Sequence, residues 1–139
     1  MGAWGHQPFE NDGAGDLEAE LAHAEPGNLS VLESAFDAAL AAADEDGYIE
    51  VDQGEAVIAA AALLARLKAS AEVDVAERLH DWLAAAQAQD HSRLAPKARE
   101  ALDKVMSGGD TSEIVELWHD TDEFDAWLGS VQTIRAALS

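Results

Sequence analysis

Residues 56–65 read Ala56-Val-Ile-Ala-Ala-Ala-Ala-Leu-Leu-Ala65, and this stretch decides the fold. Alanine and leucine are strong helix formers, and the helix predicted over residues 52–69 is apolar on nearly every side. A helix that is apolar all round is normally surrounded by other elements. Small alanine side chains also let neighbouring helix axes approach closely, near the short end of the usual ~8–10 Å. The stretch therefore predicts a central helix.

Outward from this centre, apolar residues recur at helical spacing in six further segments. Ser30 with Glu33, and Asp52 with Glu55, fit capping boxes, in which a short polar side chain and a carboxylate bond the first backbone amides of a helix. Alanine occurs 30 times and β-branched alternation is nearly absent, so the expected fold class is all-α, a compact right-angled array of about six or seven helices. The six further helices are predicted near residues 16–24, 30–43, 74–86, 97–106, 112–118 and 121–138.

Residues 1–15 differ in composition from the rest, being rich in glycine and carrying two aromatic side chains. We predict an irregular amino-terminal arm here, followed by a single helical domain over residues 16–139. The arm is expected to be held to the body by its rings, because each buries on the order of 150–250 Å² when packed.

The predicted anchors of the arm are Trp4 and Phe9, with Asn11 and Asp12 as local caps that bond backbone amides of the coming helix. The alternative is that His6, both rings and Asp12 frame a binding surface.

The charge is large and unevenly distributed. There are 28 acids against 8 bases, for a formal net charge of −20. Residues 1–65 hold 14 acids and no base (net −14), and residues 66–139 hold 14 acids and 8 bases (net −6). Such a field repels nucleic acids and anionic lipids and attracts basic proteins or divalent cations. Acidity for solubility alone, or an acidic proteome in a salt-adapted organism, remain alternatives.

The sequence argues against several kinds of functional site and against a location in the membrane. The absence of cysteine excludes disulfides, thiolate zinc sites and cysteine nucleophiles. No glycine-rich phosphate loop and no serine-elbow pattern occurs. No apolar stretch of about 18 residues is present, so no membrane span is expected. The first residues lack the charged and apolar regions of a secretory signal, so a cytoplasmic location is expected. No cofactor is expected either.

An acidic loop is predicted around Gly47. It resembles a calcium-binding EF-hand, but Ala42 falls at the first ligand position and Gln53 at the last, where a bidentate Glu is needed. A tight calcium site is therefore not expected. The loop instead supplies the candidate partner-binding residues Asp44, Glu45, Asp46, Glu50 and Asp52.

Three of the five histidines follow a glutamate at the spacing Glu-x-x-His, which bundle proteins use on facing helices to hold metal ions. At 100° per residue, however, two of these glutamates lie nearly opposite the apolar stripes of their helices, so their carboxylates should face water. No metal site is predicted. The residues that would form one are His80, His119, Glu77 and Glu116.

The opening Met1-Gly-Ala-Trp-Gly-His-Gln-Pro-Phe-Glu-Asn-Asp12 resembles the start of a bacterial family catalogued as domain of unknown function 4259. Its members typically begin Met-Gly-x-Trp-Gly-x-Gly-Pro-Phe-x-Asn-Asp, so Gln7 departs from the pattern. Tyr48-Ile-Glu50 and the ending with Trp118, Phe124, Trp127 and Leu128 are similar as well. The resemblance implies a small bacterial protein of mostly helical fold, with no activity attached.

The sequence favours a non-enzymatic interaction module that presents an acidic face to a basic partner. Its carboxylates would mimic phosphates or cover a cationic active site, as bacterial immunity proteins do for toxins. One alternative is a metal-binding protein or metal-dependent enzyme using surface histidines and carboxylates. Another is a structural homo-oligomer subunit, which gains weight if the central apolar helix is partly exposed.

Overall fold

The computed structural model describes residues 11–24, 28–69 and 79–138. These residues form an all-α fold, as predicted, and no β-strand occurs among them. The elements in chain order are α1 (Asp12–His23), α2 (Ser30–Glu45), α3 (Val51–Ala69), α4 (His80–Ala86), the 3₁₀ turn η2 (His91–Leu94), α5 (Ala95–Val105), α6 (Glu113–His119) and α7 (Phe124–Ala137).

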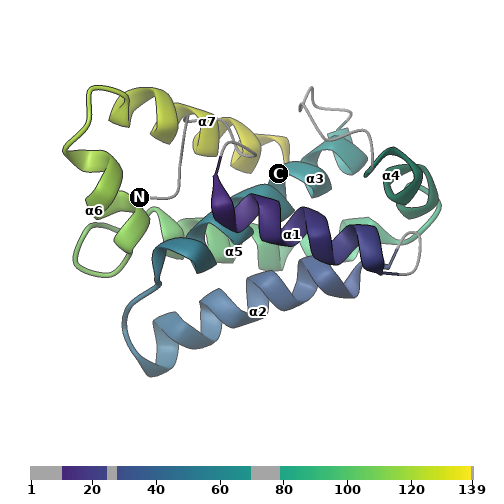
Figure 1. Ribbon diagram of the computed structural model, residues 1–139, viewed down its shortest axis with the longest axis horizontal. Helices are drawn as coiled ribbons and strands as arrows, with labels where there is room; N and C mark the ends of the chain where they lie inside the picture. The colour runs from purple at the N-terminus through teal and green to yellow at the C-terminus, as the bar shows by residue number, and fades with distance from the viewer. Residues whose placement is uncertain (1–10, 25–27, 70–78, 139) are drawn as a thin grey trace.

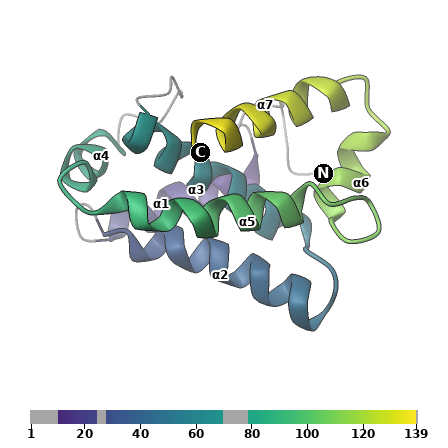
Figure 2. The ribbon, with the colours of Figure 1, turned by 180° about the vertical axis from the view of Figure 1, so that it is seen from behind.

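Helix α3 is the centre of the molecule. Every side chain from Val57 to Ala65 is at most 3% exposed, so the helix is surrounded on all sides. Helices α1, α2, α5, α6 and α7 all contact it. Helix α1 lies over α3 in one view, and α5 covers it in the opposite view (Figures 1 and 2). The central helix predicted from residues 56–65 is confirmed.

The outer helices each bury one apolar stripe. In α2 the buried side chains include Leu32 and Phe36, and in α7 they include Trp127 and Val131. Trp127 stacks on Trp118 of α6, with ring centroids 6.3 Å apart. Among the described residues, no helix is long and apolar enough to cross a bilayer.

Helices α1 and α7 start at other residues than predicted, for local reasons. Helix α1 begins at Asp12, because the Asn11 side chain accepts a hydrogen bond from the Ala14 amide at 2.8 Å. Residues 12–15 therefore belong to a helix and not to the predicted arm. Helix α7 begins at Phe124, because the Thr121 hydroxyl donates to the Trp118 carbonyl at 2.8 Å and closes α6.

The predicted capping box of α2 is wrong. The cap residue is Leu29, with no side-chain cap bond, and Ser30 is already helical. The Ser30 hydroxyl donates to the Asn28 side chain at 2.8 Å. The Glu33 carboxylate accepts a hydrogen bond from Lys97 of α5 at 2.9 Å. A partner distant in sequence has replaced the local one.

Candidate functional site

The candidate site is the acidic turn, which we define as residues 44–52. Helix α2 ends at Glu45, and Gly47 reverses the chain with a φ of 65°, a conformation that favours glycine. Helix α3 then begins at Val51. The five carboxylates predicted to bind a partner are all exposed here, namely Asp44, Glu45, Asp46, Glu50 and Asp52.

The backbone of the acidic turn is fixed by bonds to the segment that precedes α6. The Ile49 amide donates to the Thr111 carbonyl, and the Glu113 amide donates to the Ile49 carbonyl, both at 2.9 Å. The Ile49 side chain is buried. The Glu113 carboxylate also accepts a hydrogen bond from the Val51 amide at 2.8 Å, and so caps α3 from another helix. The carboxylates of the turn are thus attached to a backbone that these hydrogen bonds fix in place.

Three cations of the described residues, Arg93, Lys97 and Arg135, pair with acids outside the acidic turn. The Lys97 ammonium lies 2.9 Å from Glu33 and 2.8 Å from Asp37, and its hydrogen bond lowers the pKa of Glu33. Arg135 bonds Asp103 through two nitrogens, at 2.6 and 3.0 Å, and lowers the pKa of that carboxyl. No described cation lies within 4.0 Å of the five carboxylates of the acidic turn. Within the described ranges, the negative charge of the acidic turn is therefore not compensated by an ion pair.

A groove adjoins the acidic turn. Helices α1 and α2 both pack on α3 but make little contact with each other, which leaves a groove of about 280 Å³ between them. Asp52 belongs to both the groove and the turn. The groove is lined by Gly13, Asp16, Leu17 and Glu20 of α1, by Val31, Ser34, Ala35 and Ala38 of α2, and by Asp52, Gln53 and Ala56 of α3.

A buried glutamate holds α1 against α3. Glu55 is only 3% exposed, and its carboxylate accepts a hydrogen bond from the Gly13 amide at 3.1 Å. It does not form the predicted reciprocal cap with Asp52. Sequence reasoning missed this role, although Glu55 lies on the same helix face as the buried Ala59 and Ala62, which was the available signal.

A second cavity, of about 500 Å³, is lined by Tyr48 of the acidic turn and by the candidate residues Glu116 and His119. The Tyr48 hydroxyl donates to the Glu116 carboxylate at 3.4 Å. Burial raises the pKa of Tyr48, and the charges of Glu113 and Glu116 raise it further. This cavity is therefore an acidic environment in which phenolate formation is disfavoured.

Replacing Glu116 with Gln is expected to lower the pKa of Tyr48 toward its ordinary value, because one of the negative charges that oppose the phenolate is removed. Tyr48 is the only tyrosine, so absorbance near 295 nm reports its titration directly. The pKa of Tyr48 in the folded protein lies above its ordinary value of 10.0, because folding favours the protonated phenol. The contribution of Tyr48 to the free energy of unfolding is therefore complete below pH 10 and is lost as the pH rises through the folded-state pKa. Glu100→Gln, an exposed change on α5, is the control and should leave the titration unchanged.

The metal-site alternative gains no support from the described residues. His119 is exposed, with its side chain 70% accessible, and His80 is exposed in a different cavity. Glu116 and His119 line one cavity, but no group of three or more His, Asp or Glu that could hold a metal occurs in the described ranges. Glu77 lies outside the described residues.

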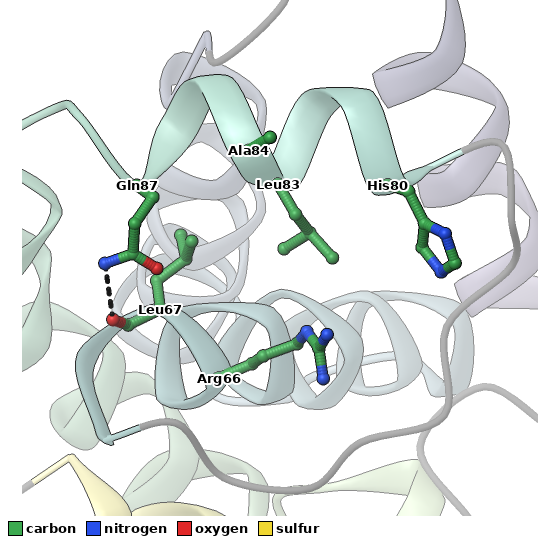
Figure 3. A pocket seen from close by; sticks show the side chains of 6 residues that line it. All are labelled: Arg66, Leu67, His80, Leu83, Ala84 and Gln87. Atoms are coloured by element: carbon green, nitrogen blue, oxygen red, sulfur yellow. Dashed lines mark hydrogen bonds between the residues drawn. The ribbon is translucent and has the colours of Figure 1, made fainter.

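The cavity that contains His80 has a different character. It has about 500 Å³ and lies between the end of α3 and helix α4. Figure 3 shows Arg66 and His80 facing the same space from the two helices, while Gln87 donates to the Leu67 carbonyl at 3.1 Å. No acid is among the described residues that line it.

The predicted arm anchors have separate outcomes. Asn11 caps α1 as predicted and is buried. Asp12 is the first residue of that helix. Trp4, Phe9 and the alternative His6 surface lie outside the described residues.

Comparison with known proteins gives one match. The model of the family described as Domain of unknown function (DUF4259) matches residues 2–130. No curated protein and no solved structure matches the chain significantly. Tyr48 and Glu116, which are hydrogen-bonded at 3.4 Å, both lie within the matched range.

Proposed function

This chain belongs to the family Domain of unknown function (DUF4259), and we propose a function for it. We propose that the protein is a non-enzymatic interaction protein that presents the acidic turn to a basic protein partner. The observation that carries the proposal is the set of five exposed carboxylates with no described cation within 4.0 Å. A partner of matching charge would place its own cationic residues against the acidic turn. These residues could belong to an active site that binds phosphates, which the carboxylates would then cover.

The fixed backbone of the turn supports the proposal. The Ile49 amide and carbonyl are hydrogen-bonded to Thr111 and Glu113 at the start of α6, so the backbone that carries the carboxylates does not have to be ordered when a partner binds. Ordering of side chains and loops is a large part of the free-energy cost of association. A held turn reduces that cost.

The position of the charges on α2 gives further support. Asp44 and Glu45 occupy the last turn of the helix, which contains no base, and Asp46 is its carboxyl-terminal cap. Acids at this end oppose the helix dipole, at a cost of roughly 0.3–1 kcal/mol each. Local rules of this kind are broken most often where function requires it.

The homo-oligomer alternative gains no weight from the central apolar helix, because Val57–Ala65 is buried within one chain. The apolar surface of α3 therefore requires no second copy.

The test compares two variants that each remove four charges. The turn variant carries Asp44→Asn, Glu45→Gln, Asp46→Asn and Glu50→Gln. The control variant carries Asp81→Asn, Glu100→Gln, Asp122→Asn and Asp125→Asn, all at exposed positions outside the turn. Binding to a labelled peptide of lysine and serine is measured by fluorescence anisotropy at low and physiological salt.

The turn variant is expected to weaken binding of this peptide by about tenfold, since each exposed ion pair contributes roughly 0.2–1 kcal/mol. The control variant should stay within about twofold of the unmodified protein, and raising the salt should weaken binding in both. Equal weakening by the two variants would show that only the overall charge acts. Binding that ignores salt would also refute the proposal.

A further inference from the structure

The groove between α1 and α2 combines an apolar floor with an acidic rim. Leu17 is 3% exposed at its base, and Val31 and Ala35 are half-buried beside it. Asp16, Glu20 and Asp52 are exposed along its edges. No cation is among the described residues that line the groove.

The two faces of α2 differ in their partners. Glu33 and Asp37 face α5, where Lys97 bonds both carboxylates. Val31, Ser34, Ala35 and Ala38 follow one another at helical spacing on the face toward α1 and line the groove. Their small side chains are the reason that space remains between two helices that both rest on α3.

Resting on the proposed function, we propose that this groove is where the basic partner docks, and that the partner segment is a cationic amphipathic helix. Its apolar side chains would contact Leu17, Val31 and Ala35, and its Lys or Arg residues would pair with the carboxylates on the rim. Helices commonly bind grooves in this way, with apolar anchors at helical spacing.

Charge and size together select this occupant. The rim residues Asp16, Glu20 and Asp52 have no described cation within 4.0 Å, so a basic segment is matched and an acidic one is repelled. A groove of about 280 Å³ is too small to enclose a helix, so the partner helix lies across it and inserts single side chains. Asp52 joins the groove to the acidic turn, which gives one continuous binding surface.

The experiment uses three labelled peptides of equal length with the intact chain. The first has leucine and lysine arranged as an amphipathic helix, and the second has the same composition in a scrambled order. The third has lysine and serine only, with the same charge. The amphipathic peptide is expected to bind at least about tenfold more tightly than the other two, because only it presents a continuous apolar face.

Two substitutions on α2 form a matched pair. Ala38→Phe places a ring into the groove, and Ala41→Phe places the same ring at an exposed position that does not line it. Ala38→Phe should weaken the amphipathic peptide by about tenfold and leave the lysine–serine peptide unchanged, while Ala41→Phe should alter neither. Circular dichroism verifies that both variants fold, and Glu20→Gln offers a second readout through the rim without added volume.

The outcomes distinguish failure of the docking groove from failure of the proposed function. If all three peptides bind equally and the acidic-turn variant still weakens them, the docking groove is refuted and the proposed function stands. If no cationic peptide binds, both are refuted. If sedimentation shows a dimer that Ala38→Phe dissociates, the groove is a contact between copies and the partner assignment is overturned.

Discussion

Gly13→Ala is expected to lower the free energy of unfolding by about 2–3 kcal/mol, whereas Gly15→Ala should leave it unchanged or raise it. A Cβ atom at position 13 would lie 2.6 Å from the Glu55 Cβ and 3.0 Å from the Asp52 carbonyl oxygen. Carbon atoms in contact prefer about 3.5–4.0 Å, so α1 must move away from α3. At position 15 nothing lies within 4 Å.

The two glycines form a control for each other because both lie in α1 and both gain the same methyl group. In a helix interior, alanine is favoured over glycine by roughly 0.5–1 kcal/mol, so Gly15→Ala isolates that benefit. Urea denaturation followed by circular dichroism gives both free energies. Equal stability of the two variants would contradict the close contact between Gly13 of α1 and Glu55 of α3.

Ala61→Leu is expected to destabilise the protein by about 2–3 kcal/mol through overpacking. Ala59, Ala60, Ala61 and Ala62 are fully buried, and four successive residues of a helix point in four directions, so α3 has no free side. The added carbon atoms must displace a neighbouring helix. Leucine is nearly as good a helix former as alanine, so the loss would come from packing and not from propensity.

The control for this substitution is Ala41→Leu on α2, where the side chain is exposed and a larger residue meets solvent. It should stay within about 0.5 kcal/mol of the unmodified protein. Thermal unfolding of both variants provides the measurement, and the difference corresponds to roughly 5–10 °C in Tm for a chain of this size. Similar Tm values for the two variants would contradict the description of α3 as a closed centre.

The positions of the helices could be predicted from local pattern, but the capping boxes predicted for α2 and α3 did not form. Glu33 and Glu55 both stand at capping-box positions, yet Glu33 bonds Lys97, 64 residues away, and Glu55 bonds the Gly13 amide, 42 residues away. A carboxylate that reaches a cation, or an unpaired buried amide in the first turn of another helix, forms a more stabilising hydrogen bond there than it would at the start of its own helix. The partner that caps α3 is Glu113, 62 residues from Val51.

The candidate site divides in the same way. Exposure of the carboxylates in the acidic turn followed from charge alone, because unpaired charges are costly to bury. The groove did not follow, because it exists only where α1 and α2 rest side by side on α3. Nothing local in the two segments indicates that Asp16 and Ala38 share one surface.

By itself, then, the sequence determined an all-α fold around the apolar helix at residues 56–65, since helix propensity and burial of apolar faces act within short stretches of chain. It also determined the concentration of acids in the first half. Only the tertiary structure decided which carboxylates are neutralised, which one is buried, and where small side chains leave a groove. Those features depend on pairs of residues far apart in sequence, whose meeting is set by how the helices pack.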